Sequence, residues 1–162
     1  MKLYLARHGE AVPKHVDPDA SLSDVGRKGV ELTATFLANS LASFDKIYHS
    51  GKTRARQTAQ IYSEAFGGKT PIEKMDGLNP MDPPEYILPT VNQWQSNTLI
   101  VGHLPFMGIL TDLILAGSNS SGIAEFETGT VVCLQRRGSG MWSMKWMITP
   151  TLLELGCGSG LS

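Results

Sequence analysis

The sequence contains little that would mark a secreted, membrane-bound or metal-binding protein. Only two of its 162 residues are cysteines, Cys133 and Cys157, and their spacing fits neither a disulfide framework nor a metal site. The N-terminus lacks the long apolar run of a signal peptide, and no stretch is long enough to span a bilayer. We therefore expect a reduced, cytoplasmic setting and no membrane partner.

An excess of charge of either sign is also missing. The 14 Lys and Arg residues are balanced by 15 Asp and Glu residues, so nucleic acid is not expected as the main partner. Hydrophobic residues make up 41% and charged residues 18% of the chain, which is typical of a globular protein. The length suits one domain with its own core, and we expect a monomer.

We assign residues 1–150 to this domain and residues 151–162 to a C-terminal tail. The tail contains a glycine-rich run, residues 154–160, that superficially resembles a nucleotide-binding loop. No clear strand precedes the run and no helix can follow it, so the context of such a loop is missing. We expect a flexible terminus.

Strand and helix patterns alternate along the first two thirds of the chain. Short apolar runs that stop at glycine or histidine indicate strands, and longer segments with helical spacing lie between them. This alternation predicts an α/β fold, a three-layer α/β/α sandwich with a mostly parallel central sheet. The expected strands begin at residues 2, 45 and 98, with a short edge strand in 69–75 and an antiparallel hairpin of 129–135 and 141–148. The expected helices begin at Ser23 and near Thr53, Pro84 and Leu104. The apolar face of the first helix is expected to carry Val25, Leu32 and Phe36, widened by Val30, Leu37 and Leu41.

Cationic and imidazole side chains recur where the three main strands end. Arg7 and His8 follow the first strand, Arg54 opens the helix after the second, and His103 follows the third. Each has a simpler interpretation: a surface turn, a solvated arginine, or a structural histidine. However, the carboxyl ends of parallel strands share one edge of a sheet, and positive charge at a helix N-terminus is unfavourable unless an anion binds there. The sequence thus predicts a phosphate site at this edge.

Four motifs resemble the histidine phosphatase superfamily, which includes the phosphoglycerate mutases. Residues 5–10 match its LxRHGE signature, and Leu22-Ser23-x-x-Gly26 matches its L-S/T-x-x-G element. The block from Ser50 to Ala59 matches S-P-x-x-R-A-x-Q-T, with Gly51 at the usual proline position, and Val101-Gly102-His103 matches the element with the second histidine. The small size and the run from Gly102 to Met107 are most similar to the SixA branch, the phosphohistidine phosphatases, a minimal form without the cap insertion of larger relatives.

The resemblance implies a catalytic set of four residues. His8 would be the nucleophile and become phosphorylated, Arg7 and Arg54 would hold the phosphoryl oxygens, and His103 would donate to one of them. Water would then hydrolyse phospho-His8, with no metal and no cofactor. Ser23 would add a hydroxyl contact to the substrate, and Glu10 would orient the loop.

A general acid is not evident in the sequence. Asp76, Asp82 and Glu85 are the nearby candidates, and we choose Asp82, although none lies in a convincing motif. An imidazole leaving group needs less protonation than an alkoxide, so a site without a dedicated acid favours phosphohistidine. The leading hypothesis is a phosphatase acting on a phosphohistidine-bearing protein. The alternatives are a small-molecule phosphomonoesterase and an inactive phosphoprotein-binding module.

Overall fold

A six-stranded mixed sheet forms the centre of the molecule, in the order β3-β2-β4-β1-β5-β6. The computed structural model describes residues 1–40, 42–118, 122–138 and 140–158. The strands are β1 (Lys2–Arg7), β2 (Lys46–His49), β3 (Ile72–Lys74), β4 (Thr98–Gly102), β5 (Val131–Arg136) and β6 (Trp142–Ile148). The helices are α1 (Asp24–Ala38), α2 (Thr53–Ala65), the short 3₁₀ helix η1 (Pro84–Tyr86), α3 (Leu88–Gln93), α4 (Phe106–Ala116) and α5 (Pro150–Gly158).

Strand direction places three strand ends at one edge of the sheet. β4 pairs in parallel with both β1 and β2, and β3 pairs in parallel with β2. β5 is antiparallel to both β1 and β6. Arg7 pairs with Gly102, and His49 pairs with Val101. The residues that follow these pairs therefore emerge side by side, and the backbone N–H of His8 donates to the Gly102 carbonyl over 3.0 Å.

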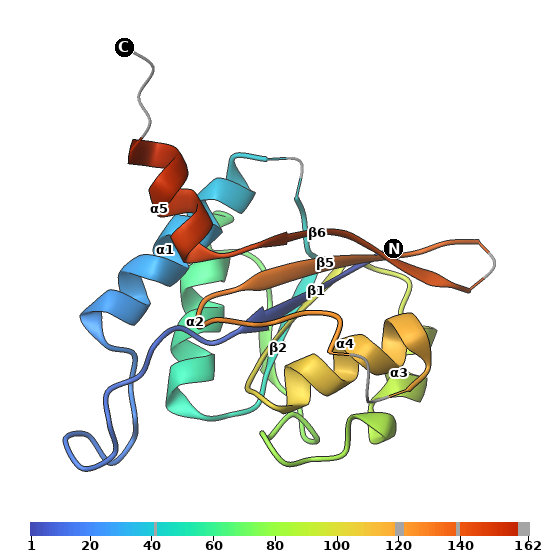
Figure 1. Ribbon diagram of the computed structural model, residues 1–162, viewed down its shortest axis with the longest axis horizontal. Coiled ribbons are helices and arrows are strands. Elements are labelled where there is room, and N and C mark those ends of the chain that lie inside the picture. The colour runs from blue at the N-terminus through green and yellow to red at the C-terminus, as the bar shows by residue number, and fades with distance from the viewer. Residues whose placement is uncertain (41, 119–121, 139, 159–162) are drawn as a thin grey trace.

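Helices cover both faces of the sheet (Figure 1). The alternation of side chains along β1 sends Tyr4 and Ala6 into a core shared with α1 and α2, and Leu3 and Leu5 into a core shared with α3 and α4. All five residues of β4 are buried, as expected of a central strand. The predicted three-layer α/β/α sandwich with a mostly parallel sheet is confirmed, as are the edge strand β3 and the β5–β6 hairpin.

The predicted apolar face of α1 is confirmed at Val30 and Leu37 but wrong at Val25 and Phe36, and Leu41 lies outside the described residues. Val25 is 68% exposed and Phe36 is 47% exposed; the buried positions are Gly26, Val30, Thr33, Ala34 and Leu37. The helix is rotated because Gly26 must lie against the backbone of Glu10, and because the Thr33 hydroxyl forms a 2.9 Å hydrogen bond with the hydroxyl of Tyr62 in the core. Thr33, a polar residue whose hydroxyl has hydrogen-bond partners, is therefore buried on a face where the helical pattern predicted apolar residues.

The expectation of a C-terminal tail without regular structure is also wrong for its first part. Residues 150–158 form α5, which packs on α1 (Figure 1). Pro150 begins this helix, a position that suits its fixed φ, and its ring lies over Gly29 and Gly129. Residues 159–162 lie outside the described part of the chain.

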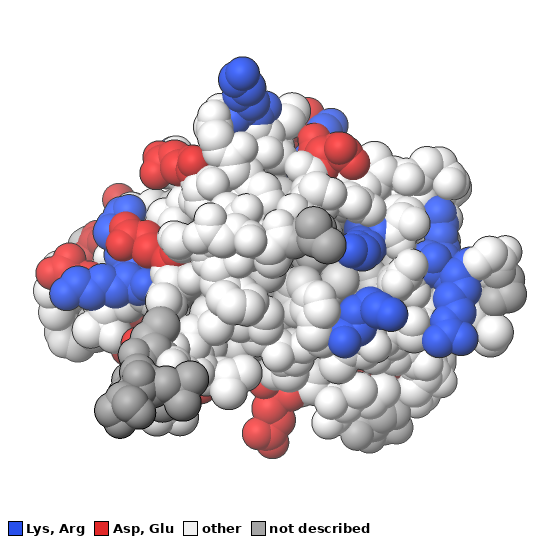
Figure 2. Space-filling model, turned by 90° about the horizontal axis from the view of Figure 1, so that it is seen from above, with Lys and Arg blue, Asp and Glu red and all other residues white. Residues whose placement is uncertain are grey.

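The surface matches the balanced composition. Figure 2 shows a broad uncharged area in the middle of one face, with charged side chains around it. A groove of about 410 Å³ lies between α1 and β6, lined by Tyr4, Phe36 and Trp146 among others. Cys133 is a buried free thiol, while the side chain of Cys157 is outside the described part. No helix in the described residues is long and apolar enough to cross a membrane.

Candidate active site

The first histidine is fixed in one tautomer by its two partners. His8 is 9% exposed, and its Nδ1 lies 2.6 Å from the carbonyl oxygen of Gly9. A carbonyl can only accept, so Nδ1 carries the proton. On the other side of the ring, Arg54 Nε donates to His8 Nε2 over 3.1 Å. The unprotonated Nε2 therefore faces the guanidinium group of Arg54.

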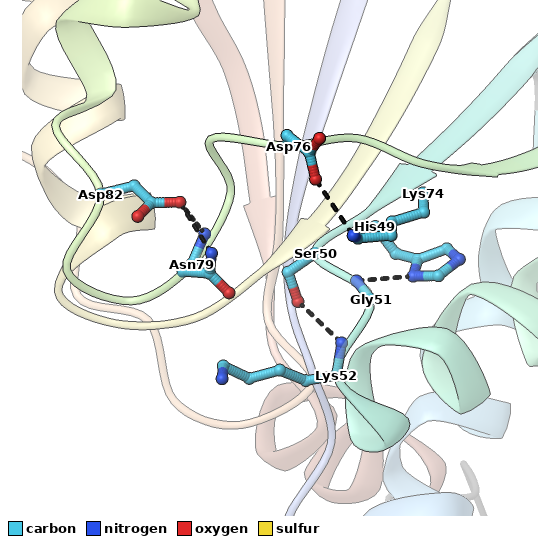
Figure 3. Close-up of polar contacts among 8 residues, drawn as sticks. All are labelled: His49, Ser50, Gly51, Lys52, Lys74, Asp76, Asn79 and Asp82. Atoms are coloured by element: carbon cyan, nitrogen blue, oxygen red, sulfur yellow. Dashed lines mark hydrogen bonds and ion pairs between the residues drawn. The ribbon is translucent and has the colours of Figure 1, made fainter.

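The second histidine lies beside the first. The ring centroids of His8 and His103 are 4.8 Å apart, and His103 Nε2 is 2.6 Å from the hydroxyl of Ser50. The Ser50 hydroxyl also accepts from the backbone N–H of Lys52 over 3.4 Å (Figure 3). We adopt the arrangement in which the hydroxyl gives its own proton to Nε2 of His103, which leaves the His103 proton on Nδ1.

Burial and positive charge keep both rings neutral near pH 7. The pKa of His8 is lowered to about 4, mainly because burial disfavours the charged ring and also because Arg54 and Arg7 lie nearby; the hydrogen bond to Gly9 opposes this shift. The pKa of His103 is lowered to about 3 by burial, and further by His8 and the surrounding cations. Two neutral imidazoles thus stand among permanently charged guanidinium groups.

Unsatisfied donors point to an anion. Arg7 donates from Nη1 to the carbonyl oxygen of Phe126 over 2.7 Å, but its Nε is buried and has no hydrogen-bond partner among the described residues. The same holds for Nδ1 of His103 and for the hydroxyl of Thr130, whose backbone carbonyl binds the N–H of Arg7. An oxyanion accepts from such donors through charge-assisted hydrogen bonds.

Two glycines permit the backbone to pack tightly under His8. A Cβ atom on Gly9 would lie 2.6 Å from the carbonyl oxygen of Gly26, and one on Gly26 would lie 2.0 Å from the carbonyl oxygen of Glu10. The N–H of Gly9 donates to the Thr58 hydroxyl over 3.2 Å, and this hydroxyl donates to the carbonyl of Arg54 over 2.8 Å. The loop after β1 is therefore tied directly to α2.

Ser23 and Glu10 are bound to each other. The Ser23 hydroxyl accepts from the N–H of Gly26 over 3.0 Å as the N-cap of α1, and it donates to Oε1 of Glu10 over 2.8 Å. An orienting role for Glu10 stays a prediction. In the described part of the chain neither side chain makes a polar contact with His8 or His103, so a substrate contact from Ser23 stays a prediction.

The candidate acids are not brought to the histidines. Asp82 accepts through Oδ2 from the N–H and the side-chain amide of Asn79, over 2.8 and 2.9 Å (Figure 3). Asp76 forms a 3.1 Å ion pair with Lys74 and is 94% exposed, and Glu85 is exposed. Because Asp82 closes a local turn and contacts neither histidine among the described residues, the structure gives no support to its choice as general acid.

Ser50, Thr58 and the carbonyl of Phe126 are not among the predicted site residues with a role of their own. Ser50 and Thr58 lie in the motif around Arg54, so the motif was a signal for both. Nothing in the sequence marks the Phe126 carbonyl, which reaches Arg7 through the pairing of β1 with β5. Among the described residues no three His, Cys, Asp or Glu side chains gather to hold a metal ion; a metal-free mechanism stays a prediction.

Comparison with known proteins agrees with this geometry. The family model of the histidine phosphatase superfamily (branch 1) matches residues 3–89, which include His8 and Arg54. An uncharacterized protein of Picosynechococcus sp. is 32% identical over 124 residues, covering 72% of this chain and 74% of that protein. The phosphohistidine phosphatase SixA of Escherichia coli is 22% identical over 160 residues, covering 96% and 98%.

The fold comparison extends over nearly the whole chain. The structure of the protein histidine phosphatase SixA complexed with tungstate matches with a TM-score of 0.80 at 22% identity, and the match covers 94% of this chain and 99% of that one. The chain belongs to the histidine phosphatase superfamily and is a phosphatase, and it shares the fold of SixA.

Proposed function

We propose that this phosphatase removes the phosphoryl group from phosphohistidine on a protein, through a covalent phospho-His8 intermediate and without a metal ion. The observation that carries the proposal is the tautomer of His8. Its Nε2 lone pair faces the guanidinium group of Arg54, and its proton is held on Nδ1 by the Gly9 carbonyl.

In the first step the lone pair on Nε2 of His8 attacks phosphorus, and the bond between phosphorus and the substrate nitrogen breaks. The Gly9 carbonyl stabilises the positive charge that develops on the His8 ring, because it accepts a hydrogen bond from the Nδ1–H. Arg54 and Arg7 hold the phosphoryl oxygens, and the Nδ1–H of His103 donates to an equatorial oxygen. As Nε2 of His8 bonds to phosphorus, the guanidinium group of Arg54 exchanges its hydrogen bond to Nε2 for one to a phosphoryl oxygen.

In the second step water attacks phosphorus and the bond to Nε2 of His8 breaks. The water proton passes to solvent, and His8 leaves as a neutral imidazole because Nδ1 has kept its proton throughout. In the first step the leaving group is likewise an imidazole, that of the substrate histidine. It leaves in its neutral form once its other ring nitrogen has taken a proton from solvent. Transfer between two imidazoles therefore needs no protein acid.

An alkyl phosphate places a different demand on the site. Its alkoxide leaving group is far more basic than an imidazole with a reference pKa of about 6.5, and a general acid must protonate it. Neither Asp82 nor Asp76 contacts the histidines among the described residues. This arrangement supports phosphohistidine over phosphoserine or a sugar phosphate as substrate.

The test compares leaving groups at constant pH. We expect kcat/KM for a phosphohistidine-bearing phosphotransfer protein to exceed that for a phosphoserine peptide by about 100-fold or more, the usual contribution of a general acid. Asp82→Asn should change both values by less than about threefold. Faster hydrolysis of phosphoserine, with a large loss in Asp82→Asn, would contradict the proposal and favour a phosphomonoesterase. Binding of the phosphoprotein without turnover would favour the inactive binding module.

A further inference from the structure

The turn between β2 and α2 contains a backbone donor that the family motif lacks. The motif has proline at the position of Gly51, and proline has neither an N–H group nor access to positive φ. Gly51 has a φ of +90°, and its N–H donates to Nδ1 of His49 over 3.0 Å (Figure 3). This contact runs from a side chain to the backbone two residues on, as in an Asx turn. The rigidity of a proline ring is thus replaced by one hydrogen bond.

The same turn carries contacts to both active-site histidines. Ser50 reaches His103 through its hydroxyl, and Arg54 reaches Nε2 of His8. Both residues lie within three positions of Gly51, so the conformation of the turn sets where the hydroxyl and the guanidinium group point. A shift of about 1 Å in such groups can cost about 100-fold in rate.

Only neutral His49 can hold this turn. His49 is 6% exposed, and its pKa is lowered by burial and then by the charges of Arg56 on α2 and Lys74 on β3. Lys74 is paired with Asp76, and the partner of His49 on β4 is the apolar Val101. Protonation would turn Nδ1 into a donor that faces the donor of Gly51. Because the pKa of His49 is lowered, the hydrogen bond persists through the usual titration range of histidine and is lost only as the pH falls below that range.

We propose that His49 is a positioning residue, whose unprotonated Nδ1 holds the turn of residues 49–52 and so aligns Ser50 and Arg54 with the two histidines of the site. The importance of that alignment rests on the proposed function of His8 and His103. The hydrogen bond itself makes the alignment sensitive to protonation in a way that a proline turn would not be.

The experiment uses two substitutions of His49. Asn presents Oδ1 as an acceptor that does not titrate, whereas Ala presents none. We expect His49→Ala to lower kcat for p-nitrophenyl phosphate by about tenfold or more, and His49→Asn to restore most of it. The acid limb of the pH profile should move to lower pH in His49→Asn. His15→Asn, the same change at an exposed loop histidine, is the control and should leave the profile unchanged.

A second readout needs no substrate. In the wild-type protein the NMR signals of the Gly51 amide and the Arg54 Nε–H should move together as His49 takes up its proton, and neither should follow that titration in His49→Asn. A wild-type profile identical to that of His49→Asn, or an Arg54 signal that ignores the protonation of His49, would overturn the proposal. Failure of phosphohistidine turnover alone would count against the proposed substrate and leave these signals unaffected.

Discussion

Arg54 donates from Nε to Nε2 of His8 over 3.1 Å, and this contact defines the reactive atom of the site. A guanidinium group cannot accept, so the nitrogen that it meets must carry a lone pair. Protonating that nitrogen would place two donors face to face. The contact therefore keeps the nucleophile available and at the same time brings a permanent positive charge to the place where phosphoryl oxygens are expected.

His8 should stay neutral, with its proton on Nδ1, from about pH 8 to well below pH 6, the usual range for histidine titration. Its pKa is lowered to about 4, first by burial, so the ring binds a proton only as the pH approaches that value. The ¹⁵N shifts of the imidazole nitrogens measure both properties. A protonated Nε2 at pH 7 would contradict the assigned tautomer, and His15 gives an exposed reference in the same spectrum.

Ser50→Ala should lower kcat by about tenfold or more while changing KM little. In the arrangement that we adopt, the hydroxyl donates to Nε2 of His103 and leaves Nδ1 to donate to the substrate, and loss of one oriented donor to a transition state costs at least this much. Steady-state kinetics with a phosphohistidine protein measure it. Ser63→Ala is the matched control, because Ser63 is a buried serine of α2 whose hydroxyl donates to the Thr70 carbonyl. Equal effects of the two changes would indicate a general loss of structure.

Arg54→Lys should reduce kcat/KM by about 100-fold, although the charge is kept. Lysine offers a point charge in place of a rigid fork, so it cannot hold Nε2 of His8 and the phosphoryl oxygens in the same geometry. Arg56→Lys, at an exposed position of the same helix, should have no measurable effect. A similar loss in both variants would show that an arginine side chain anywhere on α2 matters more than the contact of Arg54 with His8.

Gly26→Ala should destabilise the fold by at least about 2 kcal/mol, as expected for overpacking against rigid backbone. The added Cβ would lie 2.0 Å from the carbonyl oxygen of Glu10, so the loop after His8 must move. Denaturant unfolding measures the change. Gly138→Ala adds a Cβ that meets nothing within 4 Å and should be close to neutral. A neutral Gly26→Ala would mean that the loop is not packed as described.

The convergence of the site was predictable because it depends on strand order and direction. Apolar runs that stop at His8, Ser50 and His103 predict buried parallel strands, and parallel strands present their carboxyl ends together. Which face of each helix is buried was harder to predict from the sequence. The buried face of α1 is decided by the contact of Gly26 with Glu10 and by the pairing of Thr33 with Tyr62, which are tertiary contacts that no periodicity contains.

Local chemistry of the turns was not predictable for a similar reason. The exchange of proline for Gly51 was visible in the sequence, but its N–H finds His49 only because both adopt the turn at the end of β2. The helix α5 was missed because its glycines oppose helix formation, while packing against α1 favours it. Asp82 was placed near the site by sequence proximity, and the structure uses its carboxylate to close the turn with Asn79.

The most direct test of the account is to trap the enzyme during turnover of a ³²P-labelled phosphohistidine protein, quench it in base, and locate the label by mass spectrometry. We predict a phosphoryl group on Nε2 of His8, formed and lost at rates compatible with turnover, and no labelled enzyme in His8→Ala. Turnover without any labelled enzyme, or a label on another residue that persists in His8→Ala, would contradict the account.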